Sequence, residues 1–104
     1  MNGEVLWNRI TSELHQSEKE LKTLKQGRWF IASYSNGKLY VDRAKNNAPS
    51  SEISTQRQIS KEEFLFVHSY YNRWLNGEVG VRHEVSRKSM NTAYIFALID
   101  KFDK

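Results

Sequence analysis

The sequence contains no cysteine, a single proline and no long apolar run. Without thiols, the chain can form neither a disulfide framework, nor a thiolate zinc site, nor a cysteine nucleophile. No segment approaches the roughly 18 consecutive apolar residues that a membrane-spanning helix needs, so we expect no membrane partner. The first residues also lack a basic stretch followed by an apolar one, which argues against a signal peptide. These absences favour a cytoplasmic protein in a reducing compartment.

The chain does contain enough apolar and aromatic material for one hydrophobic core. Its 104 residues correspond to a single domain, residues 1–104. Three tryptophans, five tyrosines and five phenylalanines supplement a modest hydrophobic fraction of 38%, because each aromatic ring buries a large area. The formal charge of +4 is compatible with polyanion binding, although proteins that bind no polyanion often carry a similar charge.

The clearest local signal is Asn36-Gly37, which lies between two β-prone segments, residues 28–35 and 38–43. Asn-Gly readily accepts the positive φ angles of a two-residue hairpin turn, and such a turn fixes the register of both strands. One face of this hairpin should therefore be the core face. Its expected cross-strand pairs are Tyr34–Leu39, Ala32–Val41 and Phe30–Arg43.

Apolar residues near the N-terminus recur at helical spacing, which predicts a first helix over residues 2–26, ended by Gly27. The stripe repeats every seven residues, as in a helix that packs on one partner surface. That surface is either the domain's own sheet or a second copy of the chain. The residues of the stripe are Trp7, Ile10, Leu14, Leu21 and Leu24, of which the first three are the interface candidates for a homodimer.

Two further helices are expected in the second half of the chain. Ser60 and Glu63 form a capping box that opens a helix with a wide aromatic stripe, and Asn76-Gly77 ends it. In the capping box the Ser60 hydroxyl accepts from the Glu63 N–H while the carboxylate reaches back. The last helix begins at Ser89 or Asn91, after which apolar residues keep the helical spacing.

Alternating polar and apolar residues predict a third antiparallel strand over residues 52–59. The expected fold class is therefore α+β: a three-stranded antiparallel sheet, made of the hairpin and this third strand, packed with three helices. We expect the strands to follow one another as a meander. Residues 78–88 fit either a short fourth strand or a helical turn, and a strand there would change the order.

The chemistry-bearing residues form no catalytic or metal-binding motif. His15, His68 and His83 lie on separate predicted elements, and none has a second ligand at the spacing that one helix face requires. Neither a Gly-x-Ser-x-Gly elbow nor a glycine-rich phosphate loop occurs. We therefore predict no metal, no cofactor and no catalytic residue, and expect a protein that is not an enzyme.

A basic cluster precedes the last predicted helix. Arg82, Arg87 and Lys88 lie within seven residues, and Arg73 lies at the end of the preceding helix. Asn91 adds a polar donor at a helix start, where backbone N–H groups and nearby cations together suit a phosphate. The pattern predicts a non-enzymatic nucleic-acid-associated module in which these five residues contact phosphates. The alternative interpretation is a solvated connector whose charges keep the protein soluble.

The outer face of the hairpin is a second candidate surface, because Trp29 and Tyr40 lie there among basic residues. Aromatic rings beside cations can stack nucleic-acid bases, as in single-strand binding proteins. The alternative is that the first helix covers this face and buries both rings. The functional alternative to nucleic-acid binding is a homodimeric or adaptor protein that uses the first helix or the exposed hairpin edge.

The motifs, taken in order, span most of the chain and together resemble those of a known class of proteins. They consist of a leading helix with Trp7 and Ile10, the segments Leu21-Lys-Thr-Leu24 and Arg28-Trp-Phe-Ile31, the Asn-Gly hairpin, the helix from Ile59-Ser60 to Trp74, and Asn91-Thr-Ala-Tyr-Ile95. The chain resembles small orphan proteins of bacterial mobile elements, of the integron gene-cassette type. The resemblance implies a compact α+β cytosolic protein that often self-associates, and it transfers no catalytic residue. If the protein is a homodimeric or adaptor protein, the resemblance implies that it serves a mobile genetic element.

Overall fold

A computed structural model describes residues 2–103, which form four helices and one four-stranded sheet. The α+β class is confirmed, although the sequence predicted one strand and one helix fewer. The strands are β1 (Lys19–Lys22), β2 (Trp29–Ser35), β3 (Lys38–Arg43) and β4 (Arg57–Ile59). The helices are α1 (Gly3–Gln16), α2 (Lys61–Leu75), α3 (Val81–Ser86) and α4 (Thr92–Phe102).

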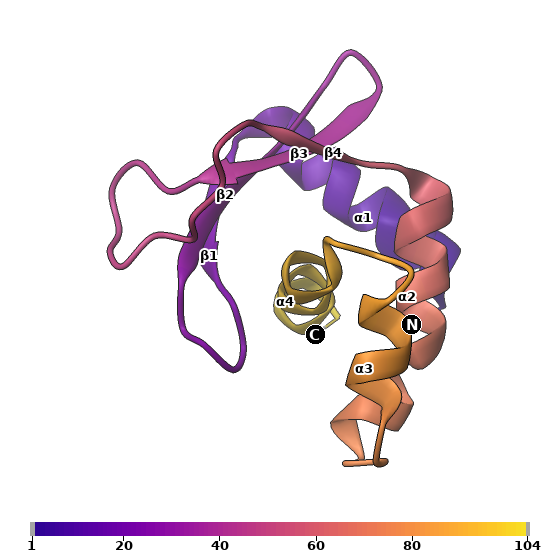
Figure 1. Ribbon diagram of the computed structural model, residues 1–104. Helices are drawn as coiled ribbons and strands as arrows, with labels where there is room; N and C mark the ends of the chain where they lie inside the picture. The colour runs from indigo at the N-terminus through magenta and orange to yellow at the C-terminus, as the bar shows by residue number, and fades with distance from the viewer. Residues whose placement is uncertain (1, 104) are drawn as a thin grey trace.

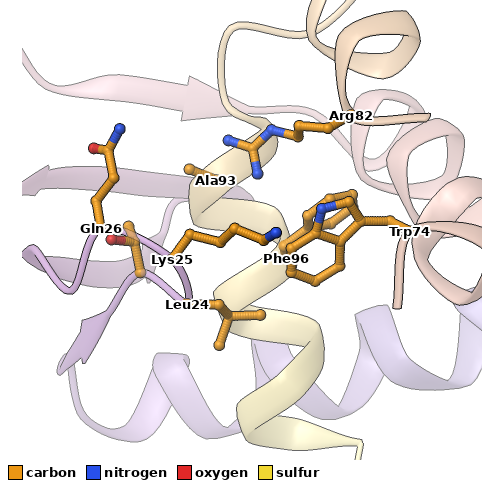
Figure 2. Close-up of a pocket in the computed structure, with 8 residues that line it drawn as sticks. Leu24, Lys25, Gln26, Trp74, Arg82, Ala93 and Phe96 are labelled. Carbon is orange, nitrogen blue, oxygen red and sulfur yellow. The ribbon is translucent and has the colours of Figure 1, made fainter. Parts of the chain in front are cut away.

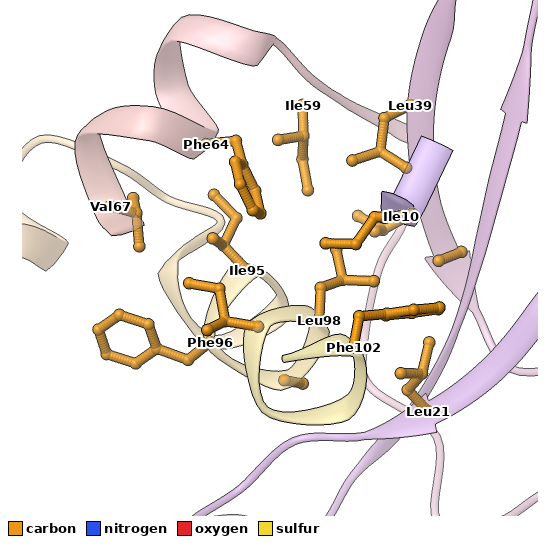
Figure 3. Close-up of a cluster of buried hydrophobic side chains, with 14 of the residues drawn as sticks. Ile10, Leu21, Leu39, Ile59, Phe64, Val67, Ile95, Phe96, Leu98 and Phe102 are labelled. Carbon is orange, nitrogen blue, oxygen red and sulfur yellow. The ribbon is translucent and has the colours of Figure 1, made fainter. Parts of the chain in front are cut away.

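The strands form an antiparallel meander in the order β1-β2-β3-β4. The sheet curves around α4, which lies at the centre of the view with α1, α2 and α3 around it (Figure 1). This central helix buries seven of its eleven residues. Its apolar side chains meet those of the sheet, α1 and α2 in one cluster, part of which is drawn in Figure 3.

The β2–β3 hairpin has the register that Asn36-Gly37 predicted. Both turn residues have positive φ angles, 53° at Asn36 and 75° at Gly37. The cross-strand partners are Tyr34 with Leu39, Ala32 with Val41 and Phe30 with Arg43. The prediction of the core face is also confirmed, because four of these side chains are fully buried: Phe30, Ala32, Leu39 and Val41.

The predicted first helix was too long. Helix α1 ends at Gln16, and the chain turns back as β1, which pairs with β2. Without β1, strand β2 would leave a row of backbone donors and acceptors unpaired at the sheet edge, and this tertiary requirement outweighs helical spacing. Leu21 therefore enters the core from a strand, whereas Leu24 lies exposed in the following turn.

The predicted third strand was also too long, since only β4 of residues 52–59 is extended. The Trp29 N–H donates to the Pro49 carbonyl, and the Ser51 N–H donates to the Trp29 carbonyl. These bonds attach residues 49–51 to β2, which pairs with one edge of β3. Strand β4 pairs with the opposite edge of β3. Residues 52–56 must therefore cross the end of β3, which prevents them from pairing.

The helical alternative for residues 78–88 is the correct one. Gly80, with a φ of 84°, precedes α3, and Val81 and Val85 are buried on one side of it. Helices α2 and α4 match the predicted periodicity. The first half of the predicted capping box forms at α2, where the Glu63 N–H donates to the Ser60 Oγ at 3.0 Å.

The seven-residue stripe of the first helix is used within the chain. Trp7, Ile10 and Leu14 keep at most 8% of their surface exposed and pack in the same cluster as the core face of the sheet. The Trp7 ring lies 5.4 Å from that of Phe64 on α2. These three residues therefore contribute to the core, and they leave no apolar seam on α1 for a second copy.

The outer face of the sheet is covered in a different way from the one expected. Helix α1 packs on the core face, so it does not cover Trp29 and Tyr40, which are half-buried. A loop after β3 attaches to this outer face through Glu20 on β1. The Glu20 carboxylate accepts from the backbone N–H groups of Lys45, Asn46 and Asn47, at 2.7, 2.9 and 3.0 Å.

We predict that this attachment makes stability pH-dependent. Desolvation raises the pKa of Glu20, but the hydrogen bonds from residues 45–47 outweigh it and hold the pKa below its ordinary value of 4.5. A lowered pKa in the folded state adds stability above the ordinary pKa, and that stability is lost as the pH falls through the folded-state pKa. Glu20→Gln should therefore lower the melting temperature at neutral pH and have little effect in strong acid.

Melting curves recorded by circular dichroism at several pH values test this prediction. The matched control is Glu52→Gln, which removes the charge of an exposed carboxylate on the same loop segment. An equal destabilisation by Glu20→Gln at neutral and at acid pH would show that the carboxylate charge does not hold the loop.

Candidate anion-binding site

The expected phosphate site at the start of α4 already holds a carboxylate of the protein. Glu63 accepts hydrogen bonds from the Ser89 Oγ at 2.7 Å and from the Asn91 Nδ2 at 3.1 Å. Its carboxylate thus faces the start of α4 rather than the Ser60 N–H, so the second half of the capping box does not form. A phosphate arriving here would meet a negative charge. Asn91 is therefore a structural partner of Glu63, and its predicted phosphate contact is not supported.

Arg73, the second residue of the predicted basic cluster to be engaged within the protein, pairs with carboxylates. Its Nε donates to the Glu78 carboxylate at 2.8 Å, and Glu84 lies 3.9 Å from its Nη2. The hydrogen bond with Glu78 raises the pKa of the Arg73 guanidinium further. An exposed ion pair adds little stability, but it does compensate the cation. Arg73 consequently offers no free positive charge to a polyanion.

The remaining predicted cations lie on two sides of α3. Arg87 and Lys88 are exposed and line a shallow hollow together with His83 and Glu84. The Lys88 ammonium lies 5.6 Å from the ring of Phe66 on α2. Arg82 instead points toward α4. The structure therefore does not gather the five predicted residues at one helix start.

Arg82 meets a cation that the sequence did not single out, Lys25 of the β1–β2 turn. Both reach into a pocket of about 150 Å³ between that turn, the end of α2, α3 and α4 (Figure 2). The Arg82 guanidinium lies 5.5 Å from the Phe96 ring, and the Lys25 ammonium lies 5.5 Å from the Trp74 ring. The lining residues are Thr23, Leu24, Lys25, Gln26, Trp74, Arg82, Ala93 and Phe96.

Local geometry fixes the positions of both cations. The Thr23 N–H donates to the Arg28 carbonyl at 2.9 Å, and the Arg28 N–H donates to the Thr23 Oγ1 at 3.0 Å. These bonds close the turn, and Gly27, with a φ of 66°, supplies its left-handed residue. On the other side, burial of Val81 anchors α3 and leaves the neighbouring Arg82 beside α4.

No carboxylate among the residues that the structure describes compensates the charges of this pocket. Neither Arg82 nor Lys25 forms an ion pair with any carboxylate of residues 2–103. The Arg82 Nε donates to the Ser86 Oγ at 3.2 Å, which leaves the other guanidinium donors available. Arg82 is partly buried, and this desolvation lowers the pKa of its guanidinium. A bound anion would offset that desolvation cost.

Two residues of the pocket escaped the sequence analysis for identifiable reasons. Lys25 lies near the end of the predicted first helix, residues 2–26, where a cation is explained by the helix dipole. Trp74 belonged to the aromatic stripe of α2, which predicts a core residue. Gly27 lies in the turn between β1 and β2 rather than at the end of a helix, so the prediction based on it placed Lys25 on the wrong element.

Among residues 2–103, no three His, Asp or Glu side chains converge in a way that could hold a metal ion. No helix in that part of the chain combines the length and the apolar content that crossing a membrane requires. The lining of the pocket offers two cations, two aromatic rings and the polar side chains of Thr23 and Gln26.

Comparison of the chain with protein-family models, with curated proteins and with solved structures finds no match. The geometry of the pocket is therefore the basis for inferring a function. That geometry is suited to holding an anion next to a flat apolar group, because cations lie at the rim and aromatic rings form the floor.

The role of Glu63 at the start of α4 gives a second prediction. Glu63→Ala should leave the buried donors of Ser89 and Asn91 without their acceptor, which costs about 1–3 kcal/mol of folding free energy. Urea denaturation followed by tryptophan fluorescence measures this loss. Glu62→Ala is the matched control, since Glu62 lies in the same first turn of α2 but is exposed. An equal loss in both variants would contradict the assignment.

Proposed function

We propose that the protein is a non-enzymatic nucleic-acid-associated module that binds the phosphate backbone at the Lys25–Arg82 pocket. One observation carries the proposal: two cations from separate elements converge on one pocket, and no carboxylate of residues 2–103 pairs with either. Cations that are compensated within the protein, such as Arg73, are poor phosphate ligands. Lys25 and Arg82 are not compensated in this way.

An extended polyanion fits the surroundings better than a small acid does. The pocket continues into an open hollow that shares Lys25, Trp74 and Arg82 with it and runs along α3 past His83 and Ser86. Glu78 also lines this hollow, but its charge is engaged by Arg73. Arg87 and Lys88 lie further along α3. The net charge of +4 would attract a polyanion to the protein.

The self-association alternative has lost one of its two surfaces, the first helix, whereas a contact through the hairpin edge stays a prediction. Trp7, Ile10 and Leu14 are buried within the chain, so a dimer would have to use another face. The resemblance to proteins of mobile elements stays a prediction. It is compatible with a nucleic-acid role, and the argument from Lys25 and Arg82 does not depend on it.

Binding should depend on salt and on these two side chains. The protein should bind labelled DNA at low ionic strength, because cation–phosphate contacts release counterions. Lys25→Ala and Arg82→Ala should each weaken binding about tenfold, as expected for a lost hydrogen bond to a charged group. Each variant should also reduce the slope of log K against log salt by roughly 0.7 on a single strand. Fluorescence anisotropy over a salt series measures both quantities.

Two other charge-removing variants serve as controls. Lys38 is exposed at the hairpin turn, and Arg9 is exposed on α1. Lys38→Ala and Arg9→Ala should leave the affinity and the salt slope nearly unchanged. The proposal fails if the protein binds neither single-stranded nor duplex DNA at low salt, or if all four variants weaken binding equally.

A further inference from the structure

We propose that the Lys25–Arg82 pocket accepts one unpaired pyrimidine base, with its phosphate held by the two cations, so that the protein selects single strands. This inference rests on the proposed function and specifies the ligand of the same site. Four observations on residues 2–103 support it: the size of the pocket, its aromatic floor, its place beside an open hollow, and the two cations at its rim that no carboxylate of these residues pairs with.

The size of the pocket matches one six-membered ring. Its volume is about 150 Å³, and a protein cavity of about 150 Å³ is known to hold benzene. A pyrimidine ring is of this size, whereas a purine has a second fused ring. Bases in a duplex are stacked and paired, so they can enter such a pocket only after being extruded.

The floor of the pocket is a supported aromatic platform. The Trp74 ring lies 4.6 Å from that of Phe96 with an interplanar angle of 32°, and Phe96 is 1% exposed. Tyr71 packs against both rings, at 5.9 and 5.5 Å. Burial, and then the charge of Asp100, raises the pKa of the Tyr71 hydroxyl, so this ring stays neutral. Trp74 keeps part of its surface exposed and is held from behind, as base stacking requires.

The cations and the hollow outside the pocket place the rest of the strand. Figure 2 shows Lys25 and Arg82 approaching the Trp74 and Phe96 rings from different elements, with Gln26 near the rim. The Lys25 ammonium now lies over the Trp74 ring, at 5.5 Å. A stacked base provides a stronger contact than an exposed cation–π pair. The flexible Lys25 side chain can therefore move from the ring to the phosphate when a base enters.

Three DNA ligands of equal length separate this inference from the proposed function: oligothymidine, oligoadenosine and their duplex. At one low salt concentration, oligothymidine should bind about tenfold more tightly than the duplex and more tightly than oligoadenosine. Trp74→Ala should weaken oligothymidine binding about tenfold, in the range found when a stacking aromatic is removed, and should leave duplex binding unchanged. Trp29→Ala, on the outer sheet face, is the matched control and should leave all three affinities unchanged.

The outcomes are distinguishable. Absence of binding to all three ligands overturns the proposed function itself. Equal affinity for oligothymidine and the duplex, with Trp74→Ala without effect on either, leaves phosphate binding in place and overturns the base pocket. If Trp29→Ala loses oligothymidine binding and Trp74→Ala does not, base stacking belongs to the outer face, and the base pocket is also overturned.

A second measurement does not depend on how well Trp74→Ala folds. In the Trp29→Phe protein, Trp74 is the half-exposed tryptophan that remains, because Trp7 is only 8% exposed. Oligothymidine should quench its fluorescence as the base stacks, whereas inorganic phosphate should not. Absence of quenching at saturating oligothymidine would overturn the inference, and equal quenching by inorganic phosphate would show that the pocket takes an anion only.

Discussion

Burial of α4 is the constraint from which the arrangement of the other elements follows. A helix with seven of its eleven residues buried needs apolar partners around most of its circumference. The sheet, α1 and α2 supply them, and α3 adds Val85 to the same cluster. This wrapping brings the β1–β2 turn to one side of α4 and Arg82 to the other. The pocket between them is thus a product of how the core closes.

The same constraint explains why a carboxylate lies at the start of α4. A buried helix start has backbone and side-chain donors that cannot reach water. Glu63 accepts from Ser89 and Asn91 there and thereby ties the first turn of α2 to the beginning of α4. From the sequence, the start of α4 looks suited to a phosphate, because basic residues precede it. In the folded protein this helix start is buried, and its partner is the Glu63 carboxylate.

Local signals in the sequence predicted those parts of the structure that local interactions determine. Asn36-Gly37 specifies both the turn and the register of β2 and β3, and the spacing of apolar residues specifies α2 and α4. The failures share one cause. Residues 17–26 become a strand and a turn because β2 needs a partner at its edge, and residues 52–56 stay irregular because the chain must cross β3. Neither requirement can be read from a short window of sequence.

The candidate site shows the same division. Arg82 stood out in the sequence because it lies in a basic cluster, and it does line the pocket. Its partners Lys25 and Trp74 lie 57 and 8 positions away in the sequence and arrive through the fold. The sequence also could not show which cations are neutralised, because Glu78 and Glu84 pair with Arg73 through side-chain directions that only coordinates reveal.

Arg82 has a consequence for the stability of the protein. Its guanidinium is partly desolvated and has no carboxylate partner among residues 2–103, which raises the free energy of the native state, and an apolar side chain of similar length would remove that cost. The fold thus gives up some stability at this position. A ligand that supplies the missing negative charge binds only the folded chain, so it should recover the deficit as resistance to heat and urea.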